Sequence, residues 1–203
     1  MKLDSEVISR IALGLMFVGT ASIGIPFRLR ADRAGGRVST NVDPKWFWIL
    51  MLLVGPPMVL ACGAFLIEPR WTEFVQLHGL HPFRLLGLPL AVMGVGLFAW
   101  MFLHLGLNVT STSMPRASAV LVTSGPYRWV RHPMYSAALL LVIAATLLTT
   151  NAIVLIGGIA MFILLAARSR LEEQRLIEKF GEAYRNYQLR TGRFLPNFPG
   201  GAA

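Results

Sequence analysis

Two polar segments of this sequence carry the side chains best suited to chemistry, and a long uncharged stretch separates them. The first, GPYRWVRHPMY, places Arg131 and His132 directly before Pro133. The second, RLEEQRLIEKF, contains the adjacent carboxylates Glu172 and Glu173. Together the segments offer guanidinium groups, an imidazole, carboxylates and tyrosine hydroxyls. Such a set suits a small ligand that carries charges of both signs.

The local sequence predicts how these side chains are presented. Pro133 fits the first turn of a helix, because its missing N–H needs no partner there. A helix that begins here puts a positive N-terminus beside Arg131 and His132, which suits a carboxylate or a carbonyl-rich ligand. Adjacent carboxylates on a helix point about 100° apart, so one of Glu172 and Glu173 can face inward while the other faces water or a basic neighbour.

A second interpretation of the C-terminal segment stays open. Arg168 and Glu172 are spaced by one helical turn, as are Glu178 and Glu182. Helix-spaced charges of this kind are typical of a solvated amphipathic helix, which needs no catalytic role. The segment alone does not decide between the two interpretations.

The stretch between the two segments contains 36 consecutive residues, His132 to Ala167, without Asp, Glu, Lys or Arg. If it folds as a hairpin of two membrane helices that turns near Thr149, Thr150 and Asn151, the polar segments meet at one membrane face. We place the active site at that meeting point.

The composition indicates an integral membrane protein. Of 203 residues, 55% are hydrophobic and only 14% are charged, and the mean hydropathy is +0.58. The apolar segments are Ile11–Phe27, Trp46–Ile67, Leu85–Leu107 and Ser136–Ala167. The second of these reaches about 33 Å as a helix, enough to cross a hydrocarbon core of about 30 Å. No small-residue cleavage site follows Phe27, so we expect no cleavable signal peptide.

The distribution of Lys and Arg decides between one span and two in the last apolar segment. With two, the loop Arg28–Lys45, the loop Asn108–Met134 and the tail after Ala167 share one side and hold 15 of the 19 basic residues. With one, the split is 8 against 11. The positive-inside rule prefers the first arrangement. We therefore expect an all-α integral membrane protein with five transmembrane helices, the last two a hairpin, an outer N-terminus and a cytoplasmic C-terminal helical tail.

The net charge of +9 is then explained by topology and by attraction to anionic lipid head groups, so membrane lipids are expected partners and nucleic acid is not.

The single cysteine, Cys62, excludes an internal disulfide and a cysteine-based zinc site, and no metal site is expected. GVGLFA (Gly94 to Ala99) follows no strand, so we interpret it as helix packing instead of a dinucleotide fingerprint. His104, near the end of the third helix, is a candidate supporting residue for the site. We divide the chain into a three-helix region, 1–107, and a catalytic region, 108–203.

The two polar segments, in this order across an apolar hairpin, resemble the isoprenylcysteine carboxyl methyltransferase family and its relatives among membrane phospholipid methyltransferases. The resemblance is carried by TSGPYRWVRHPMY and LEEQRLIEKFGEAYRNYQLRTGRFLP, and it covers Leu105 to Pro196. It implies a methyltransferase with an S-adenosyl-L-methionine pocket between the last two membrane helices and the tail. The residues expected in that pocket are Tyr127, Arg131, His132, Pro133, Tyr135, Glu172 and Glu173. The family often has glycine two residues after the RHPxY tyrosine, where this chain has Ala137.

The residue types agree with the implied role. S-adenosyl-L-methionine carries a sulfonium, an ammonium and a carboxylate, which acidic and basic groups together can bind, and the rings of Tyr127 and Tyr135 could contact its adenine or sulfonium. Methyl transfer depends mainly on alignment. A carboxylate acceptor is already ionised at neutral pH, so it needs a cation to hold it but no general base. By resemblance, the expected catalytic cation is Arg190, with Arg193 as its substitute.

The acceptor itself stays open at this point. The leading expectation is a lipidic acceptor such as the carboxylate of a prenylated cysteine; a phospholipid amine and a small thiol are alternatives that call for a base or a thiolate. A non-enzymatic membrane protein whose tail binds lipid or a partner is the further alternative. The expected location is the bacterial inner membrane, or the endoplasmic reticulum of a eukaryote, with the active site on the cytoplasmic face.

Overall fold

A computed structural model describes residues 2–35 and 42–197, with side chains from Ser5 onward. This part of the chain is helical and contains no β-strand, as the sequence predicted. Its α-helices are α1 (Lys2–Gly35), α2 (Lys45–Ile67), α3 (Gly87–Leu105), α4 (Pro133–Thr149), α5 (Ala152–Phe180) and α6 (Glu182–Arg190). Short 3-10 helices lie between them: η2 (Pro69–Val75), η3 (His78–Leu86), η4 (Gly106–Asn108) and η5 (Gly125–Arg128).

Four of the helices are long and apolar enough to cross a membrane, and the protein is an integral membrane protein. They are α1, α2, α3 with its flanking turns, and α5. The apolar helix α4 has 17 residues, a length of about 25 Å, which is a little less than a hydrocarbon core of about 30 Å. The count of five spans therefore stays a prediction, since it depends on how α4 sits in the bilayer.

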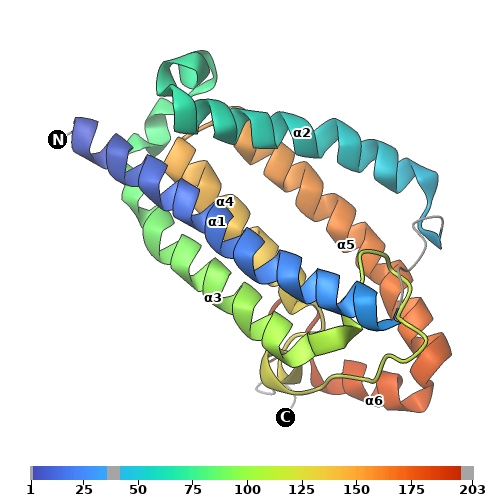
Figure 1. Cartoon of the computed structure of the whole chain (residues 1–203). Coiled ribbons are helices and arrows are strands. Elements are labelled where there is room, and N and C mark those ends of the chain that lie inside the picture. Colours follow the sequence, from blue (N-terminus) through green and yellow to red (C-terminus); the bar gives the residue numbers. More distant parts are fainter. Residues whose placement is uncertain (1, 36–41, 198–203) are drawn as a thin grey trace, which may run out of the picture.

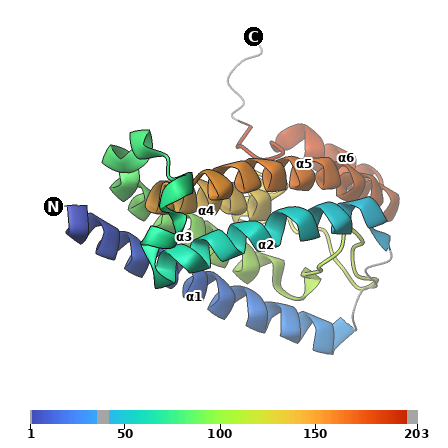
Figure 2. The same cartoon turned by 90° about the horizontal axis from the view of Figure 1, so that it is seen from above.

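The helices place the polar connections at one end of the bundle. Figure 1 shows the end of α1, the start of α2, the end of α3 and the start of α4 at the same end as α6. The turns η2 and η3 lie at the other end, near the N-terminus, and Figure 2 shows the same arrangement from above. This is the geometry that the distribution of Lys and Arg requires, although Arg37, one of the residues counted, lies outside the described residues. The cytoplasmic orientation stays a prediction.

The predicted hairpin is present, and local sequence explains its turn. Thr150 has a left-handed conformation with a φ of 49°, which ends α4. Asn151 then caps α5, because its side chain accepts hydrogen bonds from the backbone N–H groups of Ile153 (2.8 Å) and Val154 (3.3 Å). The carbonyl of Thr150 also accepts a hydrogen bond from the backbone N–H of Leu77, at 2.7 Å, which fixes the turn against the neighbouring loop.

Glycines bring the helices around the hairpin close together. A Cβ atom on Gly94 of α3 would lie 2.8 Å from Leu141 of α4, and one on Gly158 of α5 would lie 2.0 Å from Val142. Both positions therefore need glycine for close helix contact. Gly94 belongs to the GVGLFA segment, so its packing role is confirmed. A Cβ atom added to Gly96 would meet nothing within 4 Å, so this position does not need glycine for helix contact.

Helix α1 extends further than its hydrophobicity predicted. We expected a loop from Arg28, but the helix continues to Gly35. Ala31 is fully buried in a cluster that includes Phe102 and Tyr127, and Asp32 forms an ion pair with Arg116. These tertiary contacts stabilise a polar turn whose sequence alone resembles a loop.

Candidate active site

The hairpin brings the two polar segments into direct contact at the end of the bundle. The guanidinium of Arg131 donates from Nε to Glu173 Oε1 at 2.9 Å. The imidazole Nε2 of His132 lies 3.2 Å from the same carboxylate oxygen. The hydroxyl of Tyr135 donates to Glu172 Oε2 at 2.8 Å. The predicted meeting of the two segments is therefore confirmed.

Glu173 is the centre of a buried ion cluster. Its side chain is only 6% exposed, and its carboxylate binds Arg131, His132 and, through Nη2 at 2.5 Å, Arg193. A buried carboxylate requires this degree of pairing, because an uncompensated charge in the interior is strongly destabilising. Since its two oxygens are engaged by three cationic side chains, Glu173 serves mainly to hold the surrounding segments together.

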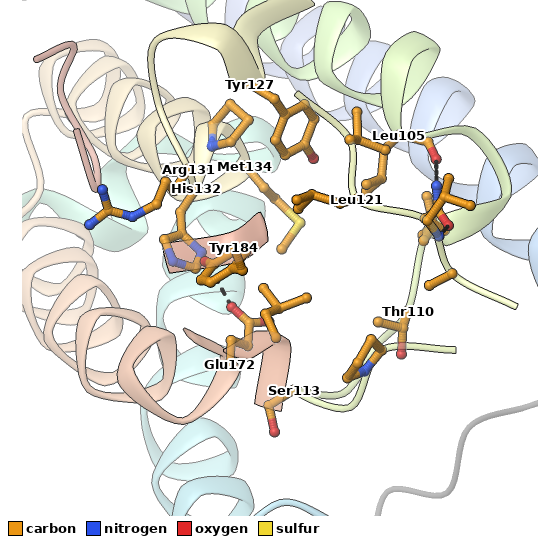
Figure 3. Close-up of a pocket in the computed structure, with 18 of the residues that line it drawn as sticks. Leu105, Thr110, Ser113, Leu121, Tyr127, Arg131, His132, Met134, Glu172 and Tyr184 are labelled. Carbon is orange, nitrogen blue, oxygen red and sulfur yellow. Dashed lines mark hydrogen bonds and ion pairs between the residues drawn. The ribbon is translucent and has the colours of Figure 1, made fainter. Parts of the chain in front are cut away.

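Glu172 occupies a different environment. It lines a cavity at this end of the bundle, where its Oε2 accepts from Tyr135 and lies 3.4 Å from His132 Nδ1. Figure 3 shows Glu172 among the residues that surround the cavity. The adjacent glutamates thus divide as the helix geometry predicted, one toward the cavity and the other toward basic neighbours.

His132 bridges the two glutamates. Burial disfavours its charged form, but hydrogen bonds to and charge interactions with Glu172 and Glu173 outweigh this effect and raise the pKa of His132 above its ordinary value. Its ring stacks on that of Tyr135, with centroids 5.3 Å apart and planes within 4°. An imidazolium can donate from both ring nitrogens, so it satisfies both carboxylates at once.

The C-terminal segment lies along the start of α4. The backbone N–H groups of Arg131 and His132 donate to the carbonyls of Gly192 (2.8 Å) and Arg193 (3.0 Å), and Gly192 N–H donates to Trp129 (3.0 Å). Tyr135 N–H is likewise bound, to His132. These groups are therefore not available to a ligand, and the helix start is less open than the sequence suggested. The segment instead closes one side of the site.

The cavity combines a polar wall with an apolar one. Its polar lining includes Thr110, Ser113, Tyr127, Tyr184, Tyr187 and Glu172, and its apolar lining includes Phe102, Leu105, Val120, Leu121, Leu176 and Phe180. Figure 3 shows Thr110 and Ser113 on a loop across the cavity from Tyr127. A cavity of this kind suits two ligands bound together, of which one is charged and the other is apolar.

Most of the predicted site residues line this cavity, but not all of them. Those that do are Tyr127, Arg131, His132, Pro133, Tyr135 and Glu172. Glu173 lies behind them in the ion cluster, with Arg193 bound to it. Arg190 ends α6 and is exposed, and it does not line the cavity. Ala137 is fully buried on α4, so its methyl group is accommodated within the packed helices.

His104 lies behind the site. A Cβ atom on Gly125 would lie 1.7 Å from the His104 ring, and Gly125 has a φ of +58°. Only glycine can therefore take this position. The ring of His104 lies directly against the turn that carries Tyr127 into the cavity, and its supporting role stays a prediction beside the alternative of an ordinary polar residue at the interface.

Sequence reasoning did not single out several residues of the site. Tyr184 and Tyr187 line the cavity from α6, and the hydroxyl of Tyr187 donates to the Tyr127 carbonyl at 2.6 Å. Their spacing of three residues, with Thr191 four further on, was a readable sign of one buried helix face. Asp43, buried near the loop 109–122, gave no local sign. Among the described residues, no group of three or more His, Cys, Asp or Glu side chains is placed to hold a metal ion.

Comparison with known proteins shows which family the chain resembles. Residues 85–178 match the model of the isoprenylcysteine carboxyl methyltransferase family. Over this region, the chain is similar to that family. The matched residues contain α4, most of α5, the RHPxY segment and both glutamates, which are the features that carried the resemblance in the sequence.

Curated relatives carry two kinds of name. The chain is 41% identical over 71 residues to a methanethiol S-methyltransferase of Pseudomonas deceptionensis, covering 35% of this chain and 26% of that protein. It is 28% identical to a protein-S-isoprenylcysteine O-methyltransferase of Tribolium castaneum, covering 82% of this chain and 66% of that protein. A protein of the same name from Dictyostelium discoideum is 35% identical over 82 residues, covering 40% of this chain and 35% of that protein. The chain thus spans less than two thirds of the length of these relatives.

A solved structure shares the fold. The structure of the eukaryotic intramembrane Ras methyltransferase, an isoprenylcysteine carboxyl methyltransferase, matches 91% of this chain and 67% of its own with a TM-score of 0.54. The two sequences are 22% identical over the match, so the likeness concerns the fold. The arrangement of helices in this chain is therefore similar to that of the solved structure.

Proposed function

We propose that this protein is an integral-membrane methyltransferase that uses S-adenosyl-L-methionine to methylate the carboxylate of a prenylated cysteine. The observation that carries the proposal is the cavity beside the buried Arg131–His132–Glu173 cluster, in which Glu172 and an apolar wall face the same space. The family match over residues 85–178 supports the same reaction class.

The cavity's charged groups fit the methyl donor, which supplies an electrophilic methyl group on a sulfonium. In the described part of the chain, only Oε2 of Glu172 makes hydrogen bonds or ion pairs, so Oε1 is available to an ammonium. Arg131 uses Nε and Nη1 for protein contacts, and Figure 3 shows its guanidinium turned away from the cavity, so we assign Arg131 to holding Glu173 and the C-terminal segment beside the ligand. The aromatic rings of Tyr127, Tyr135 and Tyr184 offer faces for adenine and for the sulfonium.

The apolar wall fits a lipidic acceptor. Leu121 and Val120 from the loop and Leu176 and Phe180 from α5 face the cavity at the end of a membrane-embedded bundle. An isoprenoid chain held there gains about 25 cal/mol for each Å² of apolar surface removed from water. The bound chain would hold its terminal carboxylate near the polar wall, so alignment provides most of the rate enhancement.

The acceptor carboxylate needs a cation, and we keep Arg190 in that role with Arg193 as the alternative. Arg190 is exposed and forms no ion pair within the described residues, so its guanidinium is available. It lies about 60° around α6 from Tyr187, which lines the cavity, so a change of rotamer can bring it toward the opening. Arg193 is bound to Glu173 and would have to leave that contact.

Incubation of the purified protein with methyl-labelled S-adenosyl-L-methionine and a prenylated cysteine tests the proposal. A carboxyl methyl ester releases labelled methanol in alkali, whereas a methylated amine or thioether keeps its label. The matched control is the same prenylcysteine with its carboxylate converted to an amide, which must remain unlabelled. Labelling of the amide, or label that resists alkali, would contradict carboxyl methylation.

A small thiol is the second candidate acceptor. It is favoured by the 41% identity over 71 residues to a methanethiol S-methyltransferase. Including methanethiol in the same assay separates the two, since its product is a volatile thioether. Higher kcat/KM for methanethiol than for prenylcysteine would replace the proposed acceptor while keeping the methyl donor.

A further inference from the structure

A buried carboxylate outside the two polar segments connects three parts of the protein. Asp43 lies two residues before the start of α2, and its side chain is 1% exposed. It accepts hydrogen bonds from the backbone N–H of Ser113, at 3.2 and 3.3 Å, and from the Ser113 hydroxyl. Arg168 and Arg175 of α5 each lie 3.5 Å from it. A single carboxylate therefore joins the start of α2, the loop that bears Ser113, and α5.

The loop that bears Ser113, which Asp43 joins to α5, forms a wall of the cavity. Thr110, Thr112 and Ser113 all line it, and Figure 3 shows Thr110 and Ser113 on that wall. Thr112 and Ser113 are buried, so this part of the loop is packed in place. The loop contains no regular secondary structure from Val109 to Ser124, so its backbone depends on side-chain contacts to keep its position.

Helix α5, which supplies Arg168 and Arg175 to Asp43, also carries the site residue Glu172 on the face that these two arginines share. Residues 168, 172, 175 and 179 fall within an arc of about 60° on α5. Of these, Arg168 donates to the Ser111 carbonyl at 3.0 Å, and Lys179 donates to the Ala117 carbonyl at 2.8 Å. The face that turns Glu172 toward the cavity is thus the face that holds the loop.

We propose that Asp43 is a positioning residue, which holds the 110–113 wall at a fixed distance from Glu172 and thereby sets the affinity for the methyl donor. The inference rests on the proposed function for the identity of that ligand. The carboxylate is needed because it neutralises two partly buried guanidinium groups while accepting from Ser113. Without it, Arg168 and Arg175 repel each other, and the loop loses its attachment at Ser113 while the bonds from Arg168 and Lys179 to its backbone remain.

Hydrogen–deuterium exchange in the ligand-free protein tests the attachment of the loop. Asp43→Asn keeps the shape and an acceptor for Ser113 but removes the charge. We expect exchange in peptides covering 109–117 to be faster by roughly tenfold or more, the factor that corresponds to loss of about 1.4 kcal/mol of local stability. Peptides from α3 and α4 should not change. Glu182→Gln, which makes the same chemical change in an exposed ion pair with Arg185, is the matched control.

Kinetics tests the effect on the donor. We expect Asp43→Asn to raise KM for S-adenosyl-L-methionine roughly tenfold while kcat at saturating donor stays within about twofold, because the wall binds the donor without contacting the reacting atoms. Unchanged loop exchange, or faster exchange with an unchanged donor KM, overturns the inference. If Asp43→Asn does not fold, Ser113→Ala decides: it keeps both ion pairs of Asp43 and removes one attachment, so it must show the same two changes to a smaller degree.

The two proposals fail separately. If the wild-type protein neither binds nor uses S-adenosyl-L-methionine, the proposed function falls, and loop exchange alone then supports or overturns the attachment by Asp43. If the wild-type protein uses the donor normally and Asp43→Asn has wild-type KM, only the positioning role of Asp43 falls.

Discussion

Glu172 and Glu173 are adjacent in the chain, yet His132 lies between their carboxylates and separates two kinds of environment. Its Nδ1 lies 3.4 Å from Glu172 and its Nε2 lies 3.2 Å from Glu173. Glu173 faces Arg131 and Arg193 in the interior, whereas Glu172 faces the cavity. One residue therefore stabilises the fold of the site, while its neighbour lines the cavity and is the one that we propose to bind a ligand.

This division predicts opposite phenotypes for the two glutamates. Glu172→Gln should abolish the rise in Tm that S-adenosyl-L-methionine produces, with little change in the Tm of the ligand-free protein, because a ligand stabilises only the state that binds it. Glu173→Gln should lower the ligand-free stability by about 3 kcal/mol or more, since it leaves buried cations without a full partner. Thermal unfolding in detergent, with and without the donor, measures both. Equal effects of the two substitutions would contradict the division.

The imidazole between them predicts a pH dependence of stability. The pKa of His132 is raised in the folded protein, so its contribution to stability is fully present below its unfolded pKa of about 6.5 and is lost as pH rises through the folded pKa. The Tm of the ligand-free protein should therefore fall as pH increases above about 6.5. His132→Gln, which cannot titrate, should have a lower Tm and should lose this component. A Tm that rises over the same interval in the wild type would mean that His132 is neutral in the folded state.

The features that could be predicted from the sequence are those with local causes. The uncharged stretch, the proline at the start of α4 and the Asn151 cap together indicate the hairpin, and the hairpin brings Arg131 and His132 to the glutamates. Each of these signals lies within a few residues of its effect, which is why the pairing of the two segments could be predicted.

The features that escaped prediction depend on contacts between distant parts of the chain. Asp43 meets Ser113 and Arg175, which lie 70 and 132 residues away, and nothing in its own neighbourhood marks it as buried. The last turns of α1 are helical because Ala31 and Asp32 pack against other elements. The engagement of Arg193 with Glu173 was also invisible, because it requires the chain to return along the start of α4 after α6.

Membrane topology is a further prediction. Reporters fused after Ala203 and inserted near Gly79 should lie on opposite sides of the membrane, with the C-terminal one cytoplasmic. The structure places η3, which contains Gly79, at the end of the bundle away from α6. A third reporter near Ala117 should share the side of the C-terminus. If the reporters after Ala203 and near Gly79 share a side, the five-span arrangement is wrong.

The last prediction concerns the cation that holds the acceptor. If Arg190 grips a carboxylate, Arg190→Ala should reduce kcat/KM for the acceptor by about 100-fold, because loss of a charge-assisted hydrogen-bonding partner removes about 1.5–3 kcal/mol. Binding of S-adenosyl-L-methionine should be unchanged, since the arginine contacts the acceptor. Arg190→Lys should recover only part of the loss, because an ammonium cannot form the bidentate contact.

The alternative is that Arg190 only extends to lipid head groups beside the exposed Arg185. Arg193→Ala distinguishes the two arginines by stability. Its loss removes a partner of buried Glu173, so it should lower the ligand-free Tm, whereas Arg190→Ala should leave that Tm unchanged. A different result is possible: Arg190→Ala turns over nearly normally, and Arg193→Ala loses turnover while it still binds the donor. Arg193, three residues further along the chain, would then be the residue that holds the acceptor. That result would also require Arg193 to exchange Glu173 for the acceptor during the reaction.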